Sequence, residues 1–334
     1  MSFANIKSKE VKKVIVSQGP VSTLFAETLD LKAAELYDKP PILRPSGFPI
    51  CSIKTMCNIA EYKKYGNVLQ EGNLFSTFFT SVGTTVHEGV QDWVGKTGKV
   101  LADWQCVNIK CKKSKCVDKN CKDTSCKDHT HITKTLQVGN ICKDCGSPMQ
   151  YHELEVEFDI ITGHVDLIMK IRKNAFWAGD FKTSSVKKLE DIKAPSVGYL
   201  YQISSYAYIL KHEYGINIVG FSIFYIARDN PGIYKEFQYE FDDEAEAKAK
   251  KIIDGEIRKY KAAEMAYKTG DIMHAVDVKP CKNLTHFDRI YGEKSECRFK
   301  DVCFGSKAKL KKEISDRLSH VTNRAKVKYE TGKK

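Results

Sequence analysis

The sequence predicts an α/β protein with one mixed β-sheet covered by helices. Three strand-like segments follow one another over residues 153–185, and a helical segment, a further strand and a long amphipathic helix come after them. A helix also precedes the three strands, and this order of elements is typical of an α/β or α+β core around a mixed sheet. The 334 residues, 42% of them hydrophobic, suit one large domain with insertions or two small ones.

The helices are predicted from apolar side chains that recur at spacings of three and four. This pattern covers residues 74–95, where Gly83 interrupts it, and residues 198–213, which are rich in aromatic side chains. A third helix is expected over residues 242–270, because this amphipathic segment starts with an aspartate and ends at a glycine. Between the last two helices, the apolar residues 216–227 predict a buried strand.

The three consecutive strands are predicted from alternating or apolar segments that turn residues separate. The segment ELEVEFDII at 153–161 alternates polar and apolar residues, and the expected turn after it is at residues 162–163. The second strand is expected over 164–171 and the third over 176–185, with a turn at residues 172–174 between them.

The net charge of +12 is concentrated in two short segments. Residues 106–145 hold nine lysines and four aspartates, a net charge of +5, and residues 306–334 hold ten lysines or arginines and three acidic residues, a net charge of +7. Such a basic excess is typical either of a surface that binds a polyanion or of a solvated, lysine-rich surface. The first segment also has few apolar residues, so we interpret it as an insertion that needs a metal to order it.

The sequence favours a cytoplasmic location, or the host cytoplasm if the source is a virus. No run of 18 apolar residues is present, which argues against a membrane span. Residues 1–20 contain no signal-peptide core. Seven of the twelve cysteines lie within residues 106–145, and clustered thiols in a cytoplasmic chain bind metals more often than they form disulfides.

Two carboxylates and one lysine are expected to meet on neighbouring strands. Asp166 lies on the second predicted strand, and Asp180 and Lys182 lie two residues apart on the third, so that the last two side chains share one face. Two carboxylates suit a divalent cation such as Mg²⁺ or Mn²⁺, which activates a water and neutralises charge in phosphodiester hydrolysis. An adjacent lysine stabilises the charge that develops in the transition state. The pattern therefore indicates metal-dependent phosphodiester hydrolysis.

The same residues resemble the motifs of the RecB-like branch of the PD-(D/E)XK nucleases, which includes CRISPR-associated exonucleases and many bacteriophage exonucleases. Four motifs agree in order and rough spacing: a helical histidine in VGTTVHE, a strand aspartate in ITGHVD, the D-x-K of GDFKTSS, and Q-x-x-x-Y on the next helix. The matching residues are His87, Asp166, Asp180, Lys182, Gln202 and Tyr206. The resemblance implies that His87 is a third metal ligand or a phosphate contact, and that Gln202 and Tyr206, which share a helix face, act in the active site. The alternative for Tyr206 is a place in an apolar core stripe of the same helix.

This resemblance implies a restriction-endonuclease-like nuclease domain over residues 46–305, with a helical or loop extension at 1–45 and a basic tail at 306–334. It implies a Mg²⁺- or Mn²⁺-dependent deoxyribonuclease, an exonuclease by analogy, that acts on single-stranded or end-containing duplex DNA in phage recombination, replication or repair. No Walker A motif is present, so any unwinding of the duplex requires a helicase or recombination partner. The alternative is a non-catalytic, zinc-containing protein that binds nucleic acid on a nuclease-like scaffold.

The resemblance also implies a [4Fe–4S] cluster that clasps the two ends of the nuclease domain. One cysteine before the core and three after it supply the four thiolates, and Cys51, Cys281, Cys297 and Cys303 fit this arrangement. The interval between Cys281 and Cys297 is longer than is usual in the family. Cys57 is the alternative to Cys51, and zinc is the alternative to iron at these thiols.

The insertion at 106–145 resembles a zinc ribbon. Cys142 and Cys145 form a C-x-x-C-G knuckle, and Cys106 and Cys111 offer the second pair of ligands. Phage nucleases of the same branch often carry a comparable insertion before the second motif. The lysines of the insertion are expected to contact phosphates. The residues left over, which are candidate ligands of a second zinc, are Cys116, Cys121, Cys126, His129 and His131.

Overall fold

The computed structural model describes the central part of the chain. The described residues are 36–37, 41–66, 68–69, 74–108, 111, 114–116, 130–132, 134–230 and 232–270. The predicted basic tail at 306–334 and most of the predicted extension at 1–45 lie outside them.

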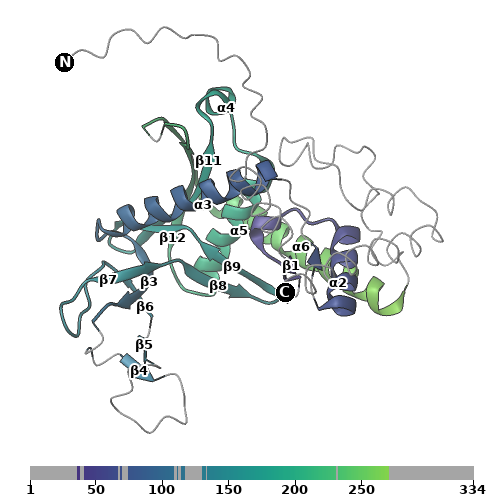
Figure 1. Ribbon diagram of the computed structural model, residues 1–334, viewed down its shortest axis with the longest axis horizontal. Coiled ribbons are helices and arrows are strands. Elements are labelled where there is room, and N and C mark those ends of the chain that lie inside the picture. The colour runs from purple at the N-terminus through teal and green to yellow at the C-terminus, as the bar shows by residue number, and fades with distance from the viewer. Residues whose placement is uncertain are drawn as a thin grey trace, which may run out of the picture.

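A four-stranded mixed sheet forms the centre of the described fold, as the sequence predicts (Figure 1). Its strands lie in the order β10 (Leu167–Arg172), β11 (Ala175–Ser184), β12 (Ile218–Ala227) and β13 (Tyr234–Glu240). The central pair, β11 and β12, is parallel, and the two outer pairs are antiparallel. The parallel strands carry long runs of buried and half-buried residues, as expected for strands covered on both faces.

Helices cover both faces of this sheet. On one face, α5 (Val197–His212) packs against β11 and β12, and α6 (Asp243–Thr269) packs against α5. The core on this face contains fully buried side chains such as Ile203 and Ile223. On the other face, α3 (Leu74–Gly95) lies against β11. The helices predicted at 74–95, 198–213 and 242–270 are therefore present within a residue of their expected bounds.

Capping residues and one close contact explain where these helices start, end and pack. The side chains of Ser196 and Asp242 accept hydrogen bonds from backbone N–H groups in the first turns of α5 and α6. Gly270, with φ 69°, ends α6. α3 runs unbroken through Gly83, where a Cβ would lie 2.9 Å from Thr183 Oγ1, so the glycine lets the helix approach β11.

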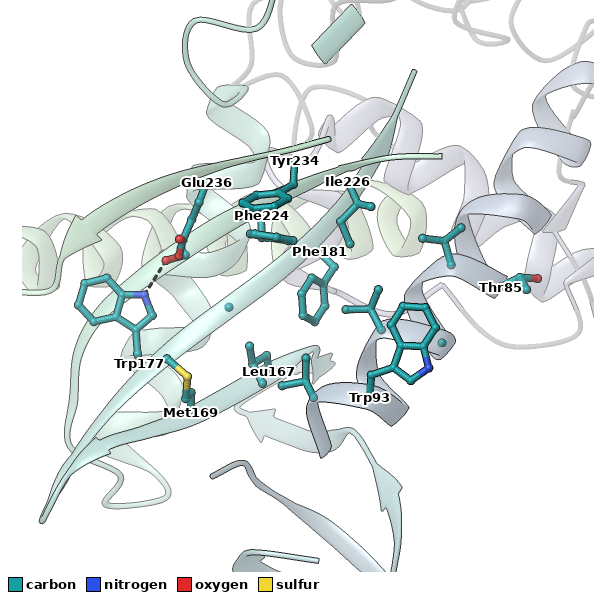
Figure 2. A pocket seen from close by; sticks show the side chains of 16 residues that line it. Thr85, Trp93, Leu167, Met169, Trp177, Phe181, Phe224, Ile226, Tyr234 and Glu236 are labelled. Atoms are coloured by element: carbon teal, nitrogen blue, oxygen red, sulfur yellow. Dashed lines mark hydrogen bonds between the residues drawn. The ribbon is translucent and has the colours of Figure 1, made fainter. Parts of the chain in front are cut away.

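An apolar cavity of about 710 Å³ opens between α3 and the sheet. Figure 2 shows aromatic side chains from α3, β11, β12 and β13 around it, among them Trp93, Phe181, Phe224 and Tyr234. Trp93 and Tyr234 are 66% and 64% exposed. Because Phe181 points into this cavity, its neighbours in β11 point to the opposite face, which α5 covers.

The hairpin before the central sheet differs from the prediction in the position of its turn. β8 (Leu154–Phe158) pairs with β9 (Ile161–Val165), and Thr162 and Gly163, predicted as the turn, lie within β9. The chain reverses earlier, at a turn in which Asp159 takes the left-handed conformation, with φ 51°. Aspartate tolerates this conformation better than most residues, which allows the earlier turn.

The predicted strand at 164–171 is divided between two sheets. It breaks at Asp166, which lies between β9 and β10. β9 belongs to the hairpin with β8, whereas β10 belongs to the central sheet. The turn that follows β10 falls at Lys173 and Asn174, within the predicted range. The break leaves Asp166 at a junction rather than within a strand.

A second, antiparallel sheet contains the ends of the predicted insertion. Its strands lie in the order β6 (Thr135–Val138), β3 (Leu101–Cys106) and β7 (Met149–His152). A bridge between Val100 and Met169 joins this sheet to β10. We call this sheet and the cysteine-rich segment that it contains the lobe. The lobe is larger than the predicted insertion at 106–145, because most of β3 and all of β7 lie outside that range.

The remaining described elements are short or lie at the periphery. α2 (Ser52–Tyr65) packs against α6. No helix in the described ranges combines the length and the apolar character that a membrane crossing needs. The other elements are β1 (Leu36–Tyr37), η1 (Pro45–Gly47), β2 (Val68–Leu69), β4 (Ser114–Cys116), β5 (Thr130–Ile132) and α4 (Val186–Asp191).

Candidate active site and four-cysteine site

Asp180 and Lys182 lie side by side on β11, on the face that α5 covers. Asp180 is 1% exposed. The Lys182 ammonium donates to Asp180 Oδ1 at 2.8 Å and lies 2.6 Å from its Oδ2. The same ammonium donates to Gln202 Oε1 at 3.3 Å and lies 4.7 Å from the centre of the Tyr199 ring. Strand alternation and two α5 side chains therefore hold the lysine against the buried carboxylate.

Asp166 reaches β11 from the junction between β9 and β10. Its Oδ2 accepts a hydrogen bond at 2.8 Å from the backbone N–H of Phe181, the residue between Asp180 and Lys182. The Tyr151 hydroxyl donates to the backbone carbonyl of Asp166 at 2.6 Å and fixes the junction. The structure thus brings together the two acids and the lysine that the sequence expects to converge.

His87 on α3 and Glu153, between β7 and β8, complete the polar cluster. His87 Nε2 lies 3.2 Å from Asp166 Oδ2 and 4.0 Å from Glu153 Oε1, and its ring meets Phe181 edge-on at 5.5 Å. Gln91, one turn further along α3, places its Nε2 3.0 Å from His87 Nε2. The same amide donates to Glu153 Oε1 at 2.6 Å and to Asp166 O at 3.2 Å.

Glu153 and Gln91 are polar residues of this cluster that the sequence analysis does not identify. Gln91 has a sequence signal, because it lies four residues after His87 and so on the same helix face. Glu153 has no such signal, because it begins an alternating segment in which the other glutamates, Glu155 and Glu157, face solvent. Only the packing of β7 against α3 brings Glu153 beside the histidine.

The acidic groups control the electrostatics of the cluster. Burial lowers the pKa of His87, but its hydrogen bond and charge interaction with Asp166 and the charge of Glu153 outweigh this effect, so the pKa is raised. Burial raises the pKa of Asp180, an effect that Lys182 opposes. Burial also lowers the pKa of Lys182, but Asp180 and Asp166 raise it by more. The cluster therefore favours positive charge.

The donor atoms fit a divalent cation. His87, Glu153 and Asp166 each offer a ligand atom, and these atoms lie within 4.8 Å of one another. Asp180 Oδ2 is buried and accepts no hydrogen bond from the described residues, although the Lys182 ammonium lies close to it. Carboxylate and imidazole ligands suit cations such as Mn²⁺, and carboxylates suit Mg²⁺.

The two residues of the fourth motif occupy different surroundings. Gln202, 7% exposed, accepts a hydrogen bond from Lys182. Tyr206 is 3% exposed and belongs to the hydrophobic core. A Cβ on Gly163 in β9 would lie 2.5 Å from the Tyr206 hydroxyl oxygen. Tyr206 therefore packs behind the strand that leads to Asp166, and a catalytic role for it stays a prediction.

Four cysteines meet at the end of the second sheet, as the zinc-ribbon resemblance implies. Cys106 Sγ lies 3.6 Å from Cys145 Sγ, and Cys111 Sγ lies 3.6 Å from Cys142 Sγ. The four sulfur atoms lie within 4.8 Å of one another; three of the cysteines are buried and Cys145 is exposed. Gly146, with φ 71°, provides the turn after the second pair. Four thiolates in this arrangement suit zinc or an iron–sulfur cluster.

The predicted iron–sulfur clasp and second zinc site stay predictions. Cys51 is half-buried at the start of α2, and Cys57 is buried within that helix. For Cys116 and His131 only the backbone is described. The other candidate ligands, Cys121, Cys126, His129, Cys281, Cys297 and Cys303, lie outside the described residues.

Comparison with known proteins does not assign the chain to a family. No family model matches the chain, and no curated protein matches it in sequence. Among solved structures, the crystal structure of SSO0001 aligns with 72% of this chain and 86% of its own, at 13% sequence identity and a TM-score of 0.34.

Proposed function

We propose that the protein is a metal-dependent DNA nuclease whose active site contains His87, Asp166, Asp180 and Lys182. The observation that supports this most directly is the hydrogen bond from the backbone of Phe181 to Asp166 Oδ2, which brings Asp166 to the Asp180–Lys182 pair. Bringing ionisable groups together in a buried place is costly. A bound cation and an anionic substrate account for that arrangement.

The residues have distinct tasks in phosphodiester hydrolysis. His87, Asp166 and Asp180 would hold Mg²⁺ or Mn²⁺, which when bound activates a water and neutralises charge on the phosphate. Lys182 orients the attacking water or stabilises the negative charge of the transition state, and Gln202 positions its ammonium. The Lys182 and His87 side chains are 18% and 25% exposed, so a phosphate has access to them.

For the four-cysteine site we propose a structural zinc ion. Zinc–thiolate bonds of about 2.3 Å place tetrahedral sulfurs roughly 3.8 Å apart, and two of the sulfur pairs here are 3.6 Å apart. A [4Fe–4S] cluster binds each thiolate to a different iron atom, which spreads the sulfurs further. All four ligands are protein thiolates, as in structural zinc sites. We propose that the lysines of this lobe contact DNA phosphates.

The wider role that we propose rests on the family resemblance. It comprises exonuclease action in phage DNA recombination, replication or repair, with a helicase or recombination partner where duplex must be unwound. The iron–sulfur clasp of Cys51, Cys281, Cys297 and Cys303 belongs to the same proposal. Protein purified without oxygen should be brown and contain iron; a colourless preparation that contains only zinc would remove the clasp from the proposal.

The decisive experiment is incubation of the purified protein with end-labelled single- and double-stranded DNA. We expect degradation with Mn²⁺, none with EDTA, and a loss of about 10²-fold or more in rate in Asp180→Ala and Lys182→Ala. Lys251→Ala, an exposed site on α6, is the control and should cleave like wild type. Wild-type rates in both active-site variants would overturn the assignment.

Two further outcomes refine the proposal. DNA binding without degradation by the wild type would favour the alternative, a non-catalytic nucleic-acid-binding protein. Loss of activity on end-blocked DNA would establish an exonuclease, whereas cleavage of circular DNA would establish an endonuclease.

A further inference from the structure

Glu153 occupies a position that the proposed catalytic residues leave unexplained. It lies between β7 and β8, outside the D-x-K strand, and its Oε1 is 4.0 Å from His87 Nε2. His87 Nε2 is in turn 3.2 Å from Asp166 Oδ2. One ligand atom from each of these three residues lies within 4.8 Å of the other two, and Asp180 is not part of this group.

Two carboxylates share this place without a lysine or arginine between them. In the described part of the chain, the Lys182 ammonium pairs with Asp180, and the ion pairs of Glu153 and Asp166 are with His87 alone. The side chains of Glu153, Asp166 and His87 are 29%, 12% and 25% exposed. Acidic groups this close and this shielded repel each other, and a bound cation relieves that repulsion, as a protonated His87 does when no cation is bound.

The hydrogen bonds of Gln91 point to the same conclusion. Its amide nitrogen donates to Glu153 Oε1 at 2.6 Å and to Asp166 O at 3.2 Å, and it lies 3.0 Å from His87 Nε2. A primary amide has only two N–H groups, and these two acceptors use both of them. The lone pair that His87 Nε2 carries in the neutral imidazole with its hydrogen on Nδ1 is then left for a cation. The amide orients Glu153 and the backbone of Asp166, as residues that hydrogen-bond to metal ligands do in metal sites.

We propose that Glu153 is a direct ligand of the active-site cation, which it binds together with His87 and Asp166. This inference rests on the proposed function for the location of the cation but not for the reaction. The imidazole nitrogen of His87 beside carboxylate oxygens favours Mn²⁺ over Mg²⁺, because Mg²⁺ prefers an all-oxygen shell and binds imidazole weakly. Glu153 therefore contributes to the affinity for the cation, and His87 contributes to the choice of metal.

The test is a titration of the zinc-loaded full chain with Mn²⁺ in the absence of DNA. Binding is measured by calorimetry and, independently, by the loss of the EPR signal of free Mn²⁺. Glu153→Gln keeps the size of the side chain and removes its charge, and we expect it to weaken Mn²⁺ binding by at least about tenfold. Glu157→Gln is the matched control, since Glu157 is exposed on the adjacent strand β8. It should bind Mn²⁺ like wild type, and Mg²⁺ should compete weakly in both proteins.

Equal Mn²⁺ affinity in Glu153→Gln and wild type would overturn the inference, as would a wild type that binds no Mn²⁺. If Glu153→Gln does not fold, Glu153→Asp replaces it, because the shorter carboxylate should bind Mn²⁺ more weakly while it retains the charge; wild-type affinity there would contradict direct ligation. DNA cleavage separates this inference from the proposed function. Wild type that binds Mn²⁺ through Glu153 but cleaves no DNA supports the metal site and contradicts the nuclease.

Discussion

At the residue scale, Gln91 links the ligand groups of the candidate site through a single amide. Its side chain is buried, and its contacts reach two acidic residues that lie 62 and 75 positions away in the chain. Such a group holds ligands at a fixed distance from one another before a cation arrives, so that less ordering is needed on binding.

We expect Gln91→Ala to weaken Mn²⁺ binding about tenfold, at the lower end of the effects seen for residues that orient metal ligands. The reason is that Glu153 and the Asp166 carbonyl lose their common donor. Calorimetric titration measures the change. Asp92→Ala, whose side chain is 59% exposed, is the neighbouring control, and identical affinities in the two variants would assign Gln91 a packing role instead.

A second residue-scale prediction concerns the support of the Asp166 junction. Gly163→Ala should lower the free energy of unfolding by about 1–3 kcal/mol, because its Cβ would lie 2.5 Å from the Tyr206 hydroxyl oxygen in the packed core. Tyr206→Phe removes that oxygen and should partly restore stability in the double variant. Urea unfolding of wild type, the two single variants and the double variant gives a double-mutant cycle. If the losses in the free energy of unfolding are additive, the contact with the hydroxyl is not their cause.

The residues of the candidate site differ in how far the sequence could predict them. Asp180 and Lys182 share a face because strand alternation is a local property, which the sequence shows directly. Gln91 could have been found from its helical spacing to His87. Glu153 could not, because its place beside the histidine depends on the packing of two elements that are distant in the chain, and its local pattern is that of a surface strand residue.

At the element scale, the sequence predicted the long elements and the turn after β10, but it misplaced the turn of the first hairpin. The predicted elements agree with β11, α5, β12 and α6. The two strands have long apolar segments, and the two helices combine an apolar pattern with residues that cap their ends. The first hairpin turns early because Asp159 adopts a left-handed conformation, which no local pattern required. β13 was not predicted, since this edge strand alternates between exposed and half-buried residues and contains no buried one.

Glu246 makes the contact between α5 and α6 sensitive to pH. Its carboxylate pairs with Lys211 and lies 2.7 Å from His212 Nε2, and the hydrogen bond from Lys211, the largest cause, lowers its pKa below the ordinary 4.5. A lowered folded-state pKa stabilises the protein above the unfolded pKa, and this contribution is lost as the pH falls through the folded-state value.

Glu246→Gln should therefore destabilise the protein at neutral pH by up to about 1 kcal/mol, the range for partly exposed pairs, and by progressively less as the pH falls below 4.5. Urea unfolding from about pH 7 to pH 3 measures the difference from wild type. Glu244→Gln, which removes an exposed pair within α6, is the control and should show a smaller change. A constant difference at every pH would contradict the ion-pair explanation.

At the scale of the whole molecule, β7 connects the four-cysteine site to the candidate active site. The strand begins four residues after Cys145 and ends at the residue before Glu153. Within it, Tyr151 donates to Asp166 O at 2.6 Å and packs edge-on against Trp104 of β3. A metal held by the four cysteines would therefore anchor the strand that supplies contacts to the candidate active site.

We predict that loss of the proposed zinc ion also weakens the binding of Mn²⁺ at the candidate active site. Cys142→Ser should reduce the zinc content measured by mass spectrometry. It should also lower Mn²⁺ affinity by about tenfold, because β7 loses the anchor that precedes it in the chain and retains its hydrogen bonds to β3 and to Asp166 O. Lys143→Ala, an exposed residue of the same turn, should retain both metals. A Cys142→Ser protein that loses zinc but keeps wild-type Mn²⁺ affinity would show that the two sites are independent. The β10 contact of the lobe would then suffice to place Glu153, since the bridge between Val100 and Met169 does not involve the cysteines.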